Sequence, residues 1–391
     1  METVIKIIKK YFKPLNTCNM KISFILFILT ASFTACNTPG SKSQSAEINK
    51  YDSLLNSVDT YLQSYVDSGF AGVALIADKD GIIFHKAYNG KGDNIDTSTA
   101  FLIASNTKGL TGLAIVRLHE QGKLSVNDSI TKYFDNVPAD KRNITIQQLL
   151  THTSGFDNCN CTDGEMDKQK IINGILHTAL QNPVGAKWSY ANENYNLLAY
   201  IIEKVSGISF RDYITKNILD VAGMNHTDEW GYEKELSVTI APIMLDSFKK
   251  QPLYNKIFSN DVYKTGLAIH GSGGYFSTTG DIYKLTQAIR ANKIISDSSF
   301  RMSLQPNTSG LIRNKDTALY YGYGMIYTMT KGKRINVFNA GREDWMMNSR
   351  IYMMENGFTI VVWTRDKSGP NYDAIATLLT NELVKMSEKI N

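Results

Sequence analysis

The chain of 391 residues carries a formal net charge of +5, and charges of both signs are dispersed along it. No basic run after the N-terminal region is longer than Lys249-Lys250, so the composition gives no electrostatic case for a nucleic-acid partner. Without a leader, roughly 345 residues remain, which suits one large domain or a domain with an inserted subdomain.

Residues 1–36 are predicted to be a leader. Lys21 follows Met20, which is an alternative start; residues 22–33 are mostly apolar, and small residues then precede Cys36. This is the layout of a secretory signal, and the apolar stretch is too short for a comfortable membrane span. The final cysteine resembles the lipid-attachment cysteine of a bacterial lipobox. The alternative is an ordinary signal peptide with a chance cysteine.

We therefore expect a lipid on Cys36 and export from the bacterial cytoplasm. The mature protein is expected to be anchored to a membrane facing the periplasm, or secreted. Residues 37–48 are rich in Ser and also contain Pro, Gly and Lys, which predicts a tether, and residues 49–391 form the folded domain.

The first elements of the domain are a helix over residues 51–68 and two strands over residues 72–77 and 82–88. Lys79-Asp-Gly81 predicts the hairpin turn between these strands. A second helix is expected over residues 105–121, and Gly122 suits the position just beyond its end.

The chain from about residue 125 to 290 is mostly helical and loop-rich, and we expect it to form an inserted subdomain. Thr145 and Gln148 fit a capping box that opens a short helix. A further helix is expected over residues 195–205, with Gly207 just beyond its end.

Strand patterns return over residues 336–339, 349–354 and 358–364, and a helix is expected over residues 372–390. Strands at both chain ends with helices between them indicate an α/β (α+β) fold. We expect a mainly antiparallel sheet, built from both chain ends, flanked by helices and interrupted by the helical insertion.

Ser105 and Lys108 lie three residues apart at the start of a predicted helix, so their side chains share one face. A serine is a poor nucleophile unless a base takes its proton, and a lysine can help when its surroundings lower its pKa. This short pattern is weak alone. The pattern is strengthened by its context: an extended segment precedes it, a helix follows it, and two further motifs lie downstream.

Tyr190 and Asn192 form the second motif, just before a predicted helix. A phenol can shuttle a proton beside a cation, and Lys108 is the candidate cation. The Asn amide can hold the lysine or a substrate carbonyl. The local alternative is an interfacial tyrosine and a helix-capping asparagine.

Asn339-Ala-Gly341 is the third motif, at the end of a predicted strand. A glycine there lets a substrate lie against the strand, where backbone N–H groups can face a carbonyl oxygen. The local alternative is a simple strand end.

Together the three motifs resemble those of the serine β-lactamase and penicillin-binding-protein superfamily, and Tyr-x-Asn is typical of its class C β-lactamase-like branch. The resemblance covers about residues 50–385. Four further segments are similar to that branch, namely residues 146–156, 183–195, 222–227 and 273–281.

The resemblance implies a serine hydrolase that forms an acyl-enzyme and needs no metal or cofactor. It implies these roles: Ser105 as the nucleophile, Lys108 and Tyr190 sharing the proton transfers, Asn192 orienting Lys108 and the substrate, and the backbone N–H groups of Ser105 and of Arg342, next to Gly341, as the oxyanion hole.

Asn339 departs from the superfamily, in which the third motif usually begins with Lys or His. A cation there attracts a substrate carboxylate, and a neutral Asn does not. The resemblance implies an ester, amide or peptide substrate, and Asn339 counts against β-lactam hydrolysis and carboxypeptidase activity more than against esterase activity. The alternatives are a D-Ala-D-Ala carboxypeptidase (a penicillin-binding protein), a true class C-type β-lactamase, or a binding or sensor lipoprotein with a decayed site.

Cys159 and Cys161 are the two cysteines of the domain. Their spacing permits a strained disulfide at best, and no His pair nearby supports a metal site, so we expect two thiols or a local loop feature. His152 is expected to be a structural hydrogen-bonding residue. The sequence does not indicate an oligomeric state.

Overall fold

The structure is a computed structural model that describes residues 45–67, 70–90, 94–162, 165, 167–232, 269–305, 312–313, 317–330, 333–343 and 347–365. Contacts between Cα atoms divide the chain into residues 1–48 and 49–391. All elements below lie in the second unit, apart from the first turn of the helix α2. The predicted leader, residues 37–44 of the predicted tether and the predicted helix over residues 372–390 lie outside the described residues. Residues 45–48 of the predicted tether are instead the start of the helix α2.

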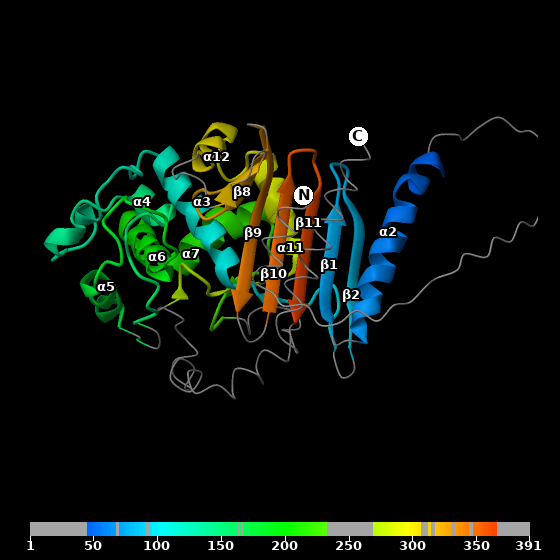
Figure 1. Cartoon of the computed structure of the whole chain (residues 1–391), viewed down its shortest axis with the longest axis horizontal. Helices are drawn as coiled ribbons and strands as arrows, with labels where there is room; N and C mark the ends of the chain where they lie inside the picture. Colours follow the sequence, from blue (N-terminus) through cyan, green and yellow to red (C-terminus); the bar gives the residue numbers. More distant parts are fainter. Residues whose placement is uncertain are drawn as a thin grey trace, which may run out of the picture. The chain divides into compact units, whose positions relative to one another are not determined.

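An eight-stranded antiparallel sheet has the order β2-β1-β11-β10-β9-β8-β7-β6 (Figure 1). Its strands are β1 (Ala71–Ala77), β2 (Ile82–Tyr88), β6 (Ile312–Arg313), β7 (Thr317–Tyr321), β8 (Ile326–Thr330), β9 (Lys333–Glu343), β10 (Met347–Met354) and β11 (Thr359–Arg365). The pairing of β1 with β11 runs from Ala71 opposite Arg365 to Ala77 opposite Thr359. The prediction of one antiparallel sheet built from both chain ends is therefore confirmed.

The centre of the sheet is buried on both faces. Val73 and Leu75 of β1 pack in the large core with Trp363, whereas Ala74 and Ile76 pack on the other face. This alternation follows from the two-residue period of a strand. Helix α2 (Ser45–Val66) covers the second face with side chains that include Val58 and Leu62.

The remaining helices surround the large core, and Figure 1 shows α3 to α7 gathered beside β9. They are η1 (Ala104–Asn106), α3 (Thr107–Glu120), η2 (Ile130–Lys132), η3 (Ala139–Lys141), α4 (Ile146–Leu150), α5 (Lys168–His177), α6 (Asn192–Ser206), α7 (Phe210–Ile214), η4 (Thr215–Leu219), α8 (Asp220–Ala222), α11 (Thr279–Arg290) and α12 (Asp297–Ser303). A small sheet of order β3-β5-β4 joins β3 (Phe101–Leu102), β5 (Tyr275–Ser277) and β4 (Asp228–Glu229).

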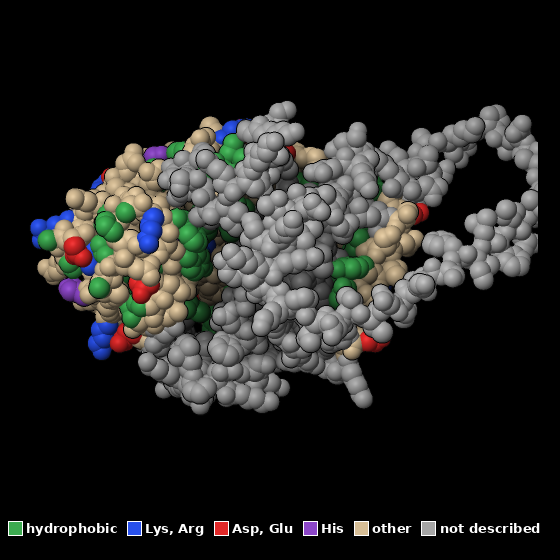
Figure 2. All heavy atoms as spheres, in the orientation of Figure 1, with side chains coloured by type: hydrophobic (Ala, Val, Ile, Leu, Met, Phe, Trp, Pro, Cys, Tyr) green, Lys and Arg blue, Asp and Glu red, His purple; other side chains and the backbone are tan. Residues whose placement is uncertain are grey.

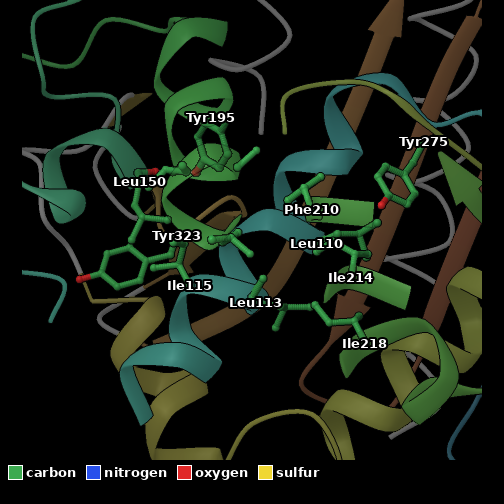
Figure 3. Close-up of a cluster of buried hydrophobic side chains, with 14 of the residues drawn as sticks. Leu110, Leu113, Ile115, Leu150, Tyr195, Phe210, Ile214, Ile218, Tyr275 and Tyr323 are labelled. Atoms are coloured by element: carbon green, nitrogen blue, oxygen red, sulfur yellow. The ribbon is translucent and has the colours of Figure 1, made fainter. Parts of the chain in front are cut away.

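Helix α3 is buried on nearly every side, unlike an amphipathic surface helix. Figure 3 shows Leu110 and Leu113 of α3 among side chains from α4, α6 and α7. Burial of a Leu side chain stabilises a fold by about 1.5–3 kcal/mol, so this packing holds α3 firmly. The helix that follows the candidate nucleophile is therefore a central part of the core.

The local signals at element ends were predicted well. Thr145 caps α4, and Gln148 completes the capping box by accepting from the Thr145 N–H. Gly207 ends α6 with a left-handed φ of 76°, which glycine adopts without strain. These contacts need only neighbouring residues, which is why the sequence reveals them.

Several parts of the fold differ from the sequence prediction. The expected helix over residues 105–121 begins as the 3₁₀ turn η1, which carries Ser105, and α3 starts only at Thr107. Strands β6 to β8 were not predicted, and β9 is longer than the expected strand over residues 336–339. Among the described residues these strands pair with one another and with β9. Strands β6 to β8 have two, five and five residues, which are too few for a clear alternating pattern.

The visible surface of the helical region carries Lys, Arg, Asp and Glu side chains scattered among polar groups, and neither sign forms a continuous patch on this face (Figure 2). Within the part of the chain that the structure describes, no helix combines the length and apolar character that a membrane span requires.

Candidate active site

Ser105 sits on η1, between β3 and α3, with its side chain half-buried. Ala104 before it has a φ of 45°, in the left-handed region that non-glycine residues rarely adopt. Asn106 after it donates a side-chain hydrogen bond to Ser349 of β10. The turn is therefore fixed to the sheet on one side and continues into the buried α3 on the other.

Lys108 is buried, with 1% of its surface exposed. Its Nζ donates to Ser105 Oγ at 3.1 Å, to Asn192 Oδ1 at 2.8 Å and to the carbonyl oxygen of Ser272 at 2.7 Å. These three bonds match the three donors of an ammonium group and hold it in one place. Gly324 fixes the backbone here, because a Cβ on it would lie 2.1 Å from the Lys108 carbonyl oxygen.

Tyr190 completes the contact with the serine. Its Oη lies 2.7 Å from Ser105 Oγ, and either oxygen can be the donor. Lys108 Nζ lies 4.8 Å from the centroid of the Tyr190 ring, within the range of a cation–π interaction. The Tyr190 phenol and the Lys108 amine are thus both within hydrogen-bond distance of the Ser105 hydroxyl.

His152 supports Tyr190 from behind. The two ring centroids are 4.6 Å apart, and His152 is fully buried. Its Nδ1 accepts from the Ala191 N–H at 3.2 Å and from Asn194 Nδ2 at 3.0 Å. Burial, and then the charge of Lys108, hold the pKa of His152 well below its usual range, so the ring is neutral and serves as a structural acceptor.

Asn192 is held on both sides of its amide. Its Oδ1 accepts from Lys108, while its Nδ2 donates to Asn160 Oδ1 at 3.1 Å and its backbone N–H donates to Asn158 Oδ1 at 2.9 Å. The next residue, Glu193, accepts from the Asn160 N–H at 2.7 Å. Burial raises the pKa of the Glu193 carboxyl.

The third motif lies on β9. In the register with β10, Asn339 is opposite Ile351, Gly341 is opposite Ser349 and Arg342 is opposite Asn348. The register of β9 with β8 ends at Phe338, and β9 contacts η1. The backbone of Gly341 is therefore placed one strand from Ser349, which holds the serine turn, whereas the side chains of this motif lie outside the described part of the structure.

The structure thus brings four predicted site residues into direct contact: Ser105, Lys108, Tyr190 and Asn192. It places the strand of Asn339, Gly341 and Arg342 beside them, and Cys36 lies outside the described residues. Sequence reasoning missed Ser272, Asn158 and Asn160. Ser272 directly precedes a Gly-Gly segment that resembled the family, but a carbonyl acceptor carries no side-chain signal.

Cys159 and Cys161 form a disulfide, so the expectation of two thiols is wrong. The two sulfurs face the Glu193 carboxylate, and these three residues are the one His, Cys, Asp and Glu group in the described ranges whose ligand atoms cluster closely enough to hold a metal ion. Sulfurs that are bonded to each other are not thiolate ligands, so the oxidised pair does not fit a metal.

The chain is similar to known proteins over most of its length. The β-lactamase family model matches residues 58–385. Penicillin-binding protein 4* of Bacillus subtilis (strain 168) is 26% identical over 327 residues, covering 78% of this chain and 70% of that protein. Protein flp of Staphylococcus aureus (strain NCTC 8325 / PS 47) is 33% identical over 44% of this chain and 37% of its own length. These two relatives are therefore matched over 70% and 37% of their own length, and a third curated relative, also from Bacillus subtilis (strain 168), is matched over 62%.

Two solved structures have the same fold. A penicillin-binding protein from Bacillus halodurans has a TM-score of 0.63 at 23% identity, covering 82% of this chain and 98% of that one. A D-amino acid amidase from Ochrobactrum anthropi SV3 has a TM-score of 0.67 at 18% identity, covering 87% and 100%.

Proposed function

Because this chain belongs to the β-lactamase family, we propose that it is a serine hydrolase that forms an acyl-enzyme on Ser105 with an ester, amide or peptide substrate. One observation carries the proposal: Ser105 Oγ lies within hydrogen-bond distance of both Tyr190 Oη and Lys108 Nζ. A nucleophile with a proton acceptor in place is the minimum requirement for acyl transfer. Family members that are penicillin-binding proteins and amidases support a hydrolase.

The proposed reaction begins when Ser105 Oγ attacks the substrate carbonyl carbon and its proton passes to the Tyr190–Lys108 pair. One member of the pair must have lost a proton beforehand, as phenolate or free amine. The pair then delivers the proton to the leaving group. Water attacks the acyl-enzyme by the same route in reverse and restores the Ser105 hydroxyl.

The substrate carbonyl is proposed to lie between η1 and β9. The backbone N–H groups of Ser105 and Arg342 would bind its oxygen as negative charge develops, which typically contributes several kcal/mol to catalysis. The portion of β9 beyond Phe338, where the pairing with β8 ends, is the strand along which an extended substrate can lie. This supports an acyl group presented by an extended chain.

For the substrate class, we propose a neutral ester or amide ahead of a carboxylate-bearing β-lactam or peptide. The basis is Asn339, which brings no positive charge to the strand beside the nucleophile. The alternative is a peptide ending in a carboxylate, which the penicillin-binding names of relatives favour. Arg342 in the same strand is the cation that this alternative requires.

Intact-protein mass spectrometry after exposure to a p-nitrophenyl ester and to a penicillin tests the proposal. We expect an acyl adduct from the ester that disappears with time, which shows turnover, and little adduct from the penicillin. Ser105→Ala should give no adduct. Ser64→Ala, which changes an exposed serine on α2, should behave as wild type. Equal acylation of Ser105→Ala and wild type would remove Ser105 as the nucleophile.

We also propose that Cys36 carries a lipid and anchors the protein to a membrane. Cys36→Ala should then move the protein from the membrane fraction to the soluble periplasmic fraction. Recovery of the wild-type chain as a soluble, unlipidated protein would exclude the anchor and would leave the proposed activity untouched.

A further inference from the structure

A short loop that carries the disulfide lies against the first turn of α6, beside the candidate active site. The loop runs from Asn158 to Cys161 and touches α6 at Asn192 and Glu193. The disulfide joins Cys159 to Cys161, the two cysteines on either side of Asn160. The loop therefore connects a disulfide to Asn192, the residue that binds Lys108.

Asn160 carries most of this connection. Its Oδ1 accepts from Asn192 Nδ2 at 3.1 Å, and its N–H donates to Glu193 Oε1 at 2.7 Å. Its φ of 47° is left-handed, a conformation that Asn tolerates better than most residues. Ala104 and His152 at the same site share this feature. The bond between the flanking cysteines restricts Asn160 to this conformation.

The orientation of the Asn192 amide links the position of Asn160 to that of Lys108. An ammonium group only donates hydrogen bonds, so the amide oxygen must face Lys108, and Nδ2 must then find an acceptor on the opposite side. Asn160 Oδ1 is that acceptor. If Asn160 moves away, the amide is free to rotate, and Lys108 loses one of the three partners that hold it.

The disulfide is partly exposed to solvent, so a reducing agent can reach it. Cys161 is exposed and Cys159 is half-buried. Cys159 Sγ lies 3.4 Å from Glu193 Oε1, the oxygen that accepts from the Asn160 N–H. A disulfide sulfur has no proton, but a Cys159 thiol would be a second donor at this oxygen and would compete with Asn160.

We propose that the Cys159–Cys161 disulfide is a redox-sensitive element that positions Asn192, and that its reduction by a dithiol slows acylation of Ser105. In the reaction, a thiolate of the dithiol attacks Cys161 Sγ, the S–S bond breaks, and Cys159 leaves as a thiolate that takes a proton. The second thiol of the reagent then displaces Cys161. Two electrons and two protons pass to the cysteine pair, and the reagent becomes a cyclic disulfide.

This inference rests on the proposed function, and the experiment separates the two. The acylation rate with a p-nitrophenyl ester is measured for the full chain before reduction with dithiothreitol, after it, and after reoxidation. Mass spectrometry checks that two hydrogen atoms were gained. We expect a reversible loss of roughly five- to tenfold, the effect of one neutral hydrogen bond, in kcat rather than in KM.

Three variants identify the source of the effect. Cys18→Ser/Cys36→Ser removes the other two cysteines of the sequence and should respond as wild type does. Cys159→Ser/Cys161→Ser should have the slow rate and ignore dithiothreitol. Asn160→Gly keeps access to the left-handed conformation but removes the amide, so it should be slow with its disulfide intact and respond little to reduction.

The outcomes are distinct. Full reduction with an unchanged acylation rate, or a Cys159→Ser/Cys161→Ser variant as fast as wild type, would overturn the inference and leave the hydrolase intact. No adduct on Ser105 in either redox state would instead remove the proposed function. If the double cysteine variant does not fold, Asn160→Gly decides: a wild-type rate with a wild-type response to dithiothreitol contradicts the proposal.

Discussion

Two buried cationic side chains meet at the short segment of residues 269–273. His270 belongs to this segment, Lys108 binds to it, and the groups around the two side chains differ. The Lys108 ammonium donates to the Ser272 carbonyl oxygen and to the neutral oxygens of Ser105 and Asn192. The His270 imidazole, two residues before Ser272, forms ion pairs with Glu229 and Glu203. Burial opposes the charge on His270, but the two carboxylates outweigh it and raise the pKa of His270 to about 9.

The difference separates a group suited to proton transfer from one suited to holding structure. The two carboxylates favour the protonated form of His270, because loss of the proton would remove a cation that the buried Glu229 faces. Three hydrogen bonds to the neutral oxygens of Ser105, Asn192 and Ser272 place the Lys108 ammonium beside the candidate nucleophile. The His270 cluster anchors the segment that presents the Ser272 carbonyl to Lys108.

The largest expected effect is on stability, from His270→Ala. This change removes the cation from the buried Glu229 and from the half-buried Glu203, which should lower the free energy of unfolding by about 3–5 kcal/mol. Urea unfolding measures the loss. Arg301→Ala, which breaks an ion pair whose side chains are 61% and 56% exposed, is the control and should leave the free energy of unfolding nearly unchanged. Equal losses in the two variants would mean that the His270 cluster is not a structural anchor.

The next effect is on rate. Lys108→Ala and Tyr190→Phe should each slow acylation by an activated ester about 10²-fold. The two losses should be far from additive, because both side chains serve one proton path. Stopped-flow acylation of both single variants and the double variant tests this, and full additivity would assign them separate tasks.

A smaller effect is expected from a new cation on β9. Asn339→Lys should raise β-lactam acylation roughly tenfold, because a charge-assisted bond to a carboxylate exceeds a neutral bond by about 1 kcal/mol or more. A neutral ester should react at an unchanged rate. Paired kcat/KM measurements on a chromogenic cephalosporin and the ester test this. Brisk hydrolysis of the cephalosporin by the wild type would show that Arg342 or another cation already supplies the charge.

The most gradual effect is on the pH dependence of stability. The folded-state pKa of His270 is raised to about 9, so its stabilisation is complete below about pH 6.5 and is lost as pH rises through 9. The free energy of unfolding should fall by on the order of 1 kcal/mol per pH unit between pH 7 and 9. His270→Gln should flatten this slope. A slope unchanged by His270→Gln would assign it to other groups.

The sequence revealed the parts of this site that depend on side-chain identity and short spacing. Ser105 with Lys108, and Tyr190 with Asn192, each lie on one local segment, so their residue types survive as a pattern. The caps and turns were predicted for the same reason, as with Thr145 and its capping box.

The missed parts depend on contacts between distant segments. Ser272 contributes only a carbonyl oxygen, which every residue has. His270 meets Glu203 of α6 and Glu229 of β4 only in the folded chain, and no spacing in the sequence predicts that meeting. The Cys159–Cys161 bond was set aside on its short spacing, although the loop in fact joins the two sulfurs.

The pairing of β1 with β11 constrains the order in which the chain can fold during its synthesis. A nascent chain emerges with Ala71 early and Arg365 late, so β1 has to wait for its neighbour in the sheet. The segments from α3 to α12 come between them and share one core, so they can collapse first. Until β11 emerges, β1 exposes an apolar strand edge, the kind of surface that pairs with other chains and aggregates. A chain that ends between residues 354 and 359 would therefore contain the turn that carries Ser105 and its anchor Ser349, but would lack the strand that covers the edge of β1.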